Sequence, residues 1–214
     1  MRIGIIGPGH IGATAARLFA RAGHDVALSN SRGPASLTGL VTGINRAVGA
    51  TRVRATTAKE AAEFGEVILL AVPWRNSEAW PEADAVRGKI VIDAMNGYSA
   101  TGGIVDLGPS TSSEEVMKRL PGARLVKAFN TILWEHLAEQ ARPDLPLPKR
   151  RAIFLAGDDT EAKRIVSRLI EEIGFAPVDT GSLREGGRTQ QPGTPVYGRN
   201  LTQEEALGIL AAAH

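Results

Sequence analysis

The 214-residue chain is predicted to adopt an α/β fold built on a doubly wound, mainly parallel sheet. Short apolar runs rich in β-branched residues alternate with segments of helical composition, which is typical of parallel strands joined by helical crossovers. The first run, Arg2–Ile6, is followed at once by the glycine loop Gly7–Gly12 and then by a helical segment, Ala13–Ala22. The dinucleotide-binding fingerprint requires this context, so the sequence predicts a fold of the Rossmann type.

The glycine loop has the spacing G-x-G-x-x-G, and each glycine serves a different steric need. The first permits a tight turn, the second lets the backbone approach a pyrophosphate, and the third lets the helix pack closely on the strand. The free N–H groups at the start of the helix, and its positive dipole end, then face the phosphates. The predicted cofactor contacts from this loop are Gly7, Gly9, His10, Ile11 and Gly12.

The end of the second predicted strand, Asp25–Ser29, indicates which nucleotide is bound. NAD sites usually have a carboxylate there that accepts hydrogen bonds from the ribose hydroxyls. This chain has Asn30, Ser31 and Arg32 instead, and a guanidinium can meet a 2′-phosphate through its fork of donors. The sequence therefore predicts NADP(H), the alternative being that Arg32 is a solvated loop arginine.

The same alternation continues through the first half of the chain. Thr57 is expected to cap a helix, and Pro73 to end a central strand that is apolar throughout. Pro81 falls in or near the first turn of a predicted helix. In order, the predictions are a helix at Pro34–Val48, a strand at Thr51–Ala55, a helix at Ala58–Phe64, a strand at Glu66–Val72, a helix at Ser77–Val86 and a strand at Lys89–Ala94.

The second half begins with a long polar loop, Asn96–Ser112, and such loops in compact domains are often functional. We divide the chain into an NADP-binding domain, residues 1–141, and a smaller C-terminal α/β portion, residues 142–214, packed on it. The predicted elements are a helix capped by Ser112 or Ser113, a strand at Arg124–Phe129, a helix through Trp134 and Leu137, a strand at Ala152–Ala156, a helix at Glu161–Ile173, a strand at Phe175–Asp179, a polar segment at Leu183–Asn200 and a helix from Thr202 to Ala213.

Ligands of open α/β sheets bind beyond the carboxyl ends of the strands, and this rule names further candidates. Each candidate has an ordinary alternative: a proline can simply end a strand, a tryptophan can pack, and an asparagine can occupy a turn. Lys127 could donate a proton or hold a phosphate, although a strand lysine more often extends to solvent. The predicted cofactor-binding residues in these positions are Ala71, Val72, Pro73, Trp74, Asn96, Ala128 and Asn130.

The composition excludes several other functions. The absence of cysteine excludes disulfides, thiolate catalysis and cysteine-ligated metals, and four scattered histidines predict no metal site. A net charge of +2 gives no basic footprint for nucleic acid, and no apolar run has the length needed for a membrane. Because the chain starts at the first strand, we expect no signal peptide and a cytoplasmic protein.

No catalytic residue is assigned from the sequence. The sequence offers no pair of carboxylates that indicates acid–base catalysis, no G-x-S-x-G motif and no obvious general acid. A carbonyl or imine reductase needs a proton donor beside the hydride path. Hydride exchange between two bound cofactors can depend mainly on their positioning, which favours a second redox cofactor as the substrate.

The motifs together resemble the NADP oxidoreductases dependent on coenzyme F420, a deazaflavin, in particular a bacterial dinucleotide-binding branch. The resemblance implies a Rossmann domain, NADPH in the crevice, a flavin-like ring near the nicotinamide and often a homodimer. It places Ser31 and Arg32 at the 2′-phosphate, Val72 and Pro73 beside the nicotinamide, and Ala128 near the ring stack. The motifs that carry it are Gly7–Gly12, Asn30–Arg32, Ala71–Trp74, Val126–Thr131, Gly187-Arg188 and Gln191–Tyr197.

Three functions remain open on the sequence. The first is an NADP(H)-dependent oxidoreductase that passes hydride between NADPH and a deazaflavin or a flavin such as FMN or FAD. The second is an NADPH-dependent reductase of a small imine or carbonyl substrate; these usually have a substantial helical C-terminal domain, whereas only Leu201–His214 is available here. The third is a non-catalytic NADP(H) sensor.

Overall fold

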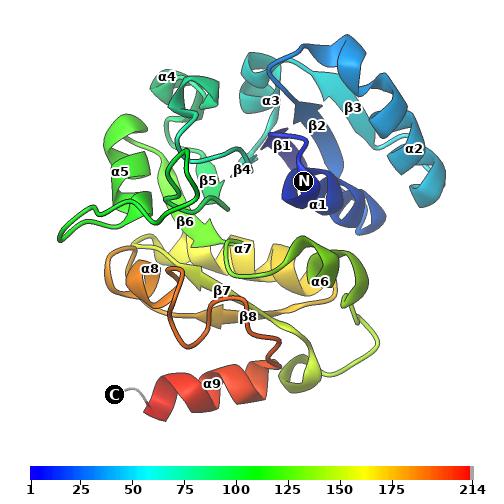
Figure 1. The fold of residues 1–214 in the computed structure, drawn as a ribbon. Coiled ribbons are helices and arrows are strands. Elements are labelled where there is room, and N and C mark those ends of the chain that lie inside the picture. The colour runs from blue at the N-terminus through cyan, green and yellow to red at the C-terminus, as the bar shows by residue number, and fades with distance from the viewer. Residues whose placement is uncertain (213–214) are drawn as a thin grey trace.

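The computed structural model describes residues 1–212, which contain one eight-stranded sheet with the order β3-β2-β1-β4-β5-β6-β7-β8 (Figure 1). Neighbouring strands are parallel except β6 and β7. The winding reverses between β1 and β4, which is the switch point of a doubly wound sheet. The strands are β1 Arg2–Ile6, β2 Asp25–Ser29, β3 Val53–Thr56, β4 Val67–Leu70, β5 Ile90–Asp93, β6 Arg124–Ala128, β7 Ala152–Ala156 and β8 Ala176–Asp179.

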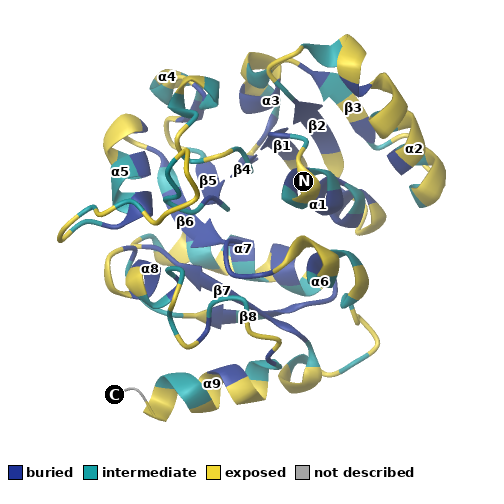
Figure 2. Ribbon diagram, viewed as in Figure 1, coloured by how far each residue is buried: buried dark blue, intermediate teal, exposed yellow. Residues whose placement is uncertain are grey.

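Helices cover both faces of the sheet and bury its central strands (Figure 2). One apolar core packs Ile3 and Ile5 against α1, α2, α6 and α7, and a second packs Ile6 against α3, α4 and α5, because successive strand residues point to opposite faces. None of these helices is long and apolar enough to cross a bilayer, within the residues described. The helices are α1 His10–Arg21, α2 Thr38–Val48, α3 Ala58–Phe64, α4 Ala83–Val86, α5 Ser112–Arg119, α6 Trp134–Glu139, α7 Thr160–Glu172, α8 Glu185–Thr189 and α9 Gln203–Ala212.

The predicted doubly wound, mainly parallel α/β fold with a C-terminal extension is confirmed. The extension joins the sheet through β7, which pairs antiparallel with Lys127 and Ala128 of β6. The division at residues 141 and 142 stays a prediction, since both parts contribute strands to the same sheet. The helix Ala58–Phe64 has the predicted bounds, and Thr57 caps it in a reciprocal arrangement with Glu60.

The predicted helix Ser77–Val86 is wrong. A 3-10 turn at Ser77–Ala79 and the one-turn α4 are separated by Trp80, whose backbone is extended, with φ −74° and ψ 156°. The cause is Pro81, because a proline drives the preceding residue out of the helical region. The chain between β4 and α4 therefore forms an irregular wall in place of a helix.

Other predicted boundaries differ from the structure at α1 and α5. Helix α1 begins at His10, because the glycine loop closes the first turn through a bond from the Ala13 N–H to the Gly9 carbonyl at 2.8 Å. Thr111, not Ser112 or Ser113, caps α5, and its side chain accepts from the Glu114 N–H. Ala213, the predicted end of the last helix, lies outside the described residues.

Candidate functional site

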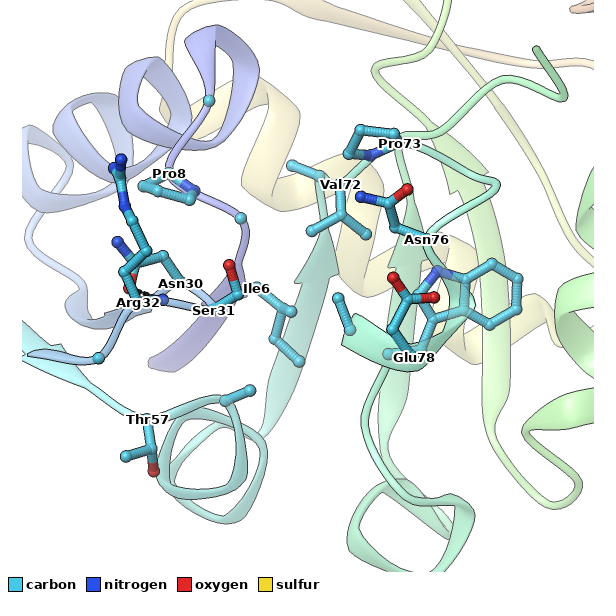
Figure 3. Close-up of a pocket in the computed structure, with 17 residues that line it drawn as sticks. Ile6, Pro8, Asn30, Ser31, Arg32, Thr57, Val72, Pro73, Asn76 and Glu78 are labelled. Carbon is cyan, nitrogen blue, oxygen red and sulfur yellow. Dashed lines mark hydrogen bonds between the residues drawn. The ribbon is translucent and has the colours of Figure 1, made fainter. Parts of the chain in front are cut away.

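A cavity of about 710 Å³ opens at the carboxyl ends of β1, β2 and β4, and we call it the main cavity. Figure 3 shows Asn30 and Arg32 on one side, Val72, Pro73 and Asn76 on the other, and Thr57 below. Eight of the predicted site residues line it: Gly7, Gly9, Asn30, Ser31, Arg32, Ala71, Val72 and Pro73. The structure thus brings together three segments that the sequence singled out separately.

The three glycines of the loop have different surroundings. A Cβ on Gly7 would lie 2.4 Å from the Ala71 carbonyl oxygen, and Gly7 has a φ of +107°, which side chains rarely adopt. A Cβ on Gly12 would lie 1.9 Å from the Gly7 carbonyl oxygen. A Cβ on Gly9 would meet nothing within 4 Å. The first and third glycines are therefore required by packing, whereas the space over Gly9 is open to a ligand.

The start of α1 supplies donors to the same space. Gly9 is its N-cap and offers no side-chain cap, so the first backbone N–H groups have no capping partner. Such a terminus attracts anions through its free donors and its dipole. An anionic group seated over Gly9 would meet these N–H groups without displacing any side chain.

The loop after β2 presents Arg32 to the cavity. The Asn30 carboxamide accepts from the Arg32 N–H at 3.1 Å and donates to the Ser36 hydroxyl at 2.8 Å, which fixes the turn. The Arg32 side chain is exposed and makes no hydrogen bond or ion pair with another residue of the described chain. Arg32 thus lines the cavity, and no residue of the described chain engages its guanidinium donors.

The opposite wall contains residues that the sequence reasoning missed as site residues. Asn76, Glu78 and Trp80 line the cavity from the irregular segment after Pro73. Thr57 was predicted only as a helix cap, and it also lines the cavity. The signal for Glu78 and Trp80 was Pro81, since a proline inside a predicted helix indicates a break where side chains can turn into a cleft.

Several predicted contacts lie outside the lining of the main cavity. His10 is exposed and stacks on Trp134 with ring centroids 4.4 Å apart, while Ile11 packs on the core and Gly12 is buried. The Trp74 indole N–H donates to the Ser112 carbonyl at 3.0 Å. For Trp74 the packing alternative is the one that the structure shows.

A second polar group lies at the ends of β5 and β6, beside a fully buried Ala128. Asn96 and Asn130 bond to each other, with the Asn130 amide donating to the Asn96 oxygen at 3.1 Å. Tyr197 and Tyr98 join them through their hydroxyls, which lie 3.0 Å apart. We call Asn96, Tyr98, Asn130, Gln190 and Tyr197 the tyrosine cluster.

Lys127 takes neither of the positions considered from the sequence. It is 1% exposed, so it neither extends to solvent nor reaches the main cavity. Its ammonium group lies 3.4 Å from an Asp93 oxygen and donates to the Ser113 hydroxyl at 3.0 Å and the Met95 carbonyl at 3.1 Å. It joins the ends of β5 and β6 to α5, which anchors both ends of the long loop 96–112.

Comparison with known proteins matches residues 2–97 to the family described as NADP oxidoreductase, coenzyme F420-dependent. The matched segment includes the glycine loop, Arg32 and the walls of the main cavity. The chain belongs to this family. An F420-dependent NADP reductase of Methanothermobacter marburgensis is 32% identical over 155 residues, which are 68% of this chain and 66% of that protein.

Two further relatives extend the family comparison. The rat metalloreductase STEAP3 is 32% identical over 185 residues, which are 85% of this chain and 34% of that protein. The chain thus spans about a third of the rat protein and just under two thirds of the archaeal one. Among solved structures, a hypothetical protein of Sinorhizobium meliloti, SMa0349, is 37% identical with a TM-score of 0.78, covering 94% of this chain and 95% of that one.

Proposed function

We propose that this family member is an NADP(H)-dependent oxidoreductase that passes hydride between NADPH and a deazaflavin or flavin co-substrate such as coenzyme F420, FMN or FAD. The observation that supports it is the pairing, in one cavity, of an open glycine backbone at Gly9 with Arg32, whose guanidinium has no partner among residues 1–212. Both features fit a phosphorylated dinucleotide, one at the pyrophosphate and one at the 2′-phosphate. Homodimer formation and a cytoplasmic location stay predictions from the sequence.

The residues of the main cavity divide the work of holding the nucleotide. The N–H groups at the start of α1 bind the pyrophosphate, and Ser31 with Arg32 binds the 2′-phosphate. Val72 and Pro73 form an apolar wall that excludes water from one side of the nicotinamide. When bound, NADPH supplies the hydride, and the chain supplies position and a dry surface.

The nucleotide assignment is tested by Arg32→Ala. A lost charge-assisted hydrogen bond costs about 1.5–3 kcal/mol, so the affinity for NADPH should fall roughly tenfold to a hundredfold while that for NADH barely changes. Arg46→Ala, an exposed arginine on α2 outside the cavity lining, is the matched control. Equal losses for both nucleotides in Arg32→Ala would remove the 2′-phosphate from this site.

The acceptor is tested by NADPH oxidation with FMN, FAD, riboflavin and the deazaflavin, with NADH in parallel lanes. Turnover with the deazaflavin and a preference for NADPH would support the full proposal. Turnover with ordinary flavins alone would keep the site and change the physiological acceptor. Tight NADPH binding without turnover in any lane would favour a sensor or a small imine or carbonyl substrate.

A further inference from the structure

The two tyrosines of the chain meet in one cluster. The sequence contains only Tyr98 and Tyr197, and their hydroxyl oxygens lie 3.0 Å apart although 99 residues separate them. Tyr98 belongs to the long loop after β5, and Tyr197 to the glycine-rich segment between α8 and α9 (Figure 1). Both side chains are partly accessible, in contrast to the buried strands beneath them.

The segment that holds Tyr197 is fastened over the ends of the strands. The Asn130 amide donates to the Gln190 carbonyl at 2.8 Å, and the Gly198 N–H donates to the Thr131 carbonyl at 3.0 Å. These bonds fix both ends of 190–198, which contains most of the C-terminal motif noted in the sequence. None of the residues in these two bonds lines the main cavity.

The hydrogen bonds of the cluster fix the orientation of the Asn96 side chain. The Asn96 oxygen accepts from Asn130, so its amide nitrogen donates, to the Asn130 carbonyl at 2.9 Å and to the Tyr197 oxygen at 3.2 Å. The Tyr197 and Tyr98 hydroxyls share one hydrogen bond, in which either oxygen can be the donor. In the arrangement in which Tyr197 donates, the Tyr98 proton is not used in this bond.

The cluster lies at the same edge of the sheet as the main cavity. The Ala94 N–H donates to the Leu70 carbonyl, which ties the chain leading to Asn96 to the end of β4, where the cavity wall Val72–Pro73 begins. Neighbouring strands are about 4.8 Å apart, so the groups after β5 and β6 lie one and two strands beyond that wall. A substrate placed beyond the nicotinamide would come to this position.

We propose that Tyr98 is the proton donor of the reaction and that Tyr197 and Asn96 are the residues that position it, an inference that rests on the proposed function. NADPH gives a hydride to the acceptor, and the acceptor nitrogen or oxygen that gains the electron pair takes the Tyr98 hydroxyl proton. The Tyr98 oxygen, which is partly accessible, then recovers a proton from solvent. One NADPH and one proton are consumed for each acceptor reduced.

The properties of Tyr197 agree with this role. Burial, together with its hydrogen bond to Tyr98, raises the pKa of Tyr197 above that of an ordinary tyrosine. Tyr197 therefore keeps its own proton and holds the Tyr98 hydroxyl through their shared hydrogen bond at 3.0 Å. The Asn96 amide holds the Tyr197 oxygen from the other side and so orients the pair of hydroxyls.

Turnover of Tyr98→Phe and Tyr197→Phe tests the proposal. Positioned general acids contribute about 100-fold or more, so kcat of Tyr98→Phe should fall by about that factor while its affinity for NADPH is unchanged. Its kcat should also rise with the concentration of buffer acid, because a small acid can replace the missing donor. Tyr197→Phe keeps the Tyr98 hydroxyl and should lose less, about tenfold. Parallel assays with a deazaflavin, FMN and a small ketone show whether the proton goes to a ring nitrogen or to a carbonyl oxygen.

A second readout does not depend on turnover. With 3-fluorotyrosine incorporated, the protein should give two fluorine NMR resonances, which the two Phe variants assign. We expect NADP⁺ with oxidised FMN, a pair that cannot react, to shift the Tyr98 resonance more than the Tyr197 resonance. Full activity of Tyr98→Phe, or an unmoved Tyr98 resonance in protein saturated with both ligands, would overturn the role of Tyr98 and leave the proposed function intact. A wild-type protein that neither binds nor oxidises NADPH would overturn the proposed function, and this proposal with it.

Discussion

The main cavity and the tyrosine cluster share one edge of the sheet but differ in how far their polar groups are bonded within the protein. Around the main cavity, the Gly9 backbone is open and the Arg32 guanidinium has no partner in the described chain. In the cluster, Asn96 bonds to both Asn130 and Tyr197, although the side-chain oxygens of Asn130 and Gln190 are buried without a partner among the described residues. Below the cluster, Lys127 is wholly buried among four polar partners.

The difference shows how one edge can serve two requirements. A site for a multiply charged ligand needs donors that are not already bonded within the protein, because the ligand must replace only water. A site that positions one reacting group needs the reverse, since each internal bond reduces the freedom of that group. The following variants test whether the two regions differ in this way.

The largest effect on stability is expected at Lys127, next to the tyrosine cluster. Lys127→Met removes one partner of a buried ion pair and leaves Asp93 uncompensated, which costs about 3–5 kcal/mol of unfolding free energy. Urea denaturation measures it. The double variant Asp93→Asn with Lys127→Met removes the stranded charge and should recover part of the loss. If Lys127→Met were as stable as the wild type, the buried bonds of Lys127 would not stabilise this region.

Two alanine variants of the glycine loop sharpen the description of the main cavity. Gly12→Ala forces a Cβ against the Gly7 carbonyl and should cost about 1–3 kcal/mol of stability. Gly9→Ala meets no protein atom and has an ordinary φ of −64°, so stability should hold while NADPH affinity falls. Urea unfolding and NADPH titration of both variants check this. Unchanged affinity in Gly9→Ala would show that no ligand approaches that backbone.

Thr57 provides an intermediate case, a cavity residue whose side chain is already engaged. Its hydroxyl accepts from the Glu60 N–H at 3.2 Å and caps α3. Thr57→Ala should therefore lower stability by about 1 kcal/mol, and Thr57→Ser should retain it. Thermal unfolding and NADPH titration report the two effects. A loss of affinity greater than the loss of stability would assign Thr57 to the ligand instead.

The smallest effect on stability is expected at the amino-terminal ends of the strands, opposite the main cavity. His24 is buried, accepts from the Met1 amino group at 3.1 Å and donates to Glu172 at 2.9 Å. Burial, reinforced by the positive amino group, lowers its pKa below the ordinary 6.5. Its neutral form thus contributes stability that is present above pH 6.5 and is lost as the pH falls through the lower folded pKa.

His24→Gln should flatten the dependence of melting temperature on pH below neutrality and leave NADPH affinity unchanged. Melting curves of both proteins over that range measure the effect. An identical pH dependence in the two proteins would show that other groups govern acid stability.

Local pattern was sufficient for the framework of the fold and for half of the site. The strands Arg2–Ile6 and Asp25–Ser29, the cap at Thr57 and the glycine loop each depend on neighbours in the chain, so short-range spacing predicts them. The approach of Arg32 to the glycine loop also follows, because parallel strands present their carboxyl ends at one edge.

Tertiary structure decided the rest. Pro81 interrupts a predicted helix, and Glu78 and Trp80 from that interrupted segment line the main cavity. Tyr98 and Tyr197 are 99 positions apart in the chain and meet only because the later segment folds back over the sheet. A pattern read over a short stretch of sequence cannot predict such a contact. Lys127 looks like a solvent-reaching strand residue until the partners that bury it are in place. The sequence alone predicted where a ligand would bind, because local order depends on neighbours in the chain. The three-dimensional contacts decided which polar groups there stay free of partners within the protein, because hydrogen bonding depends on the whole fold.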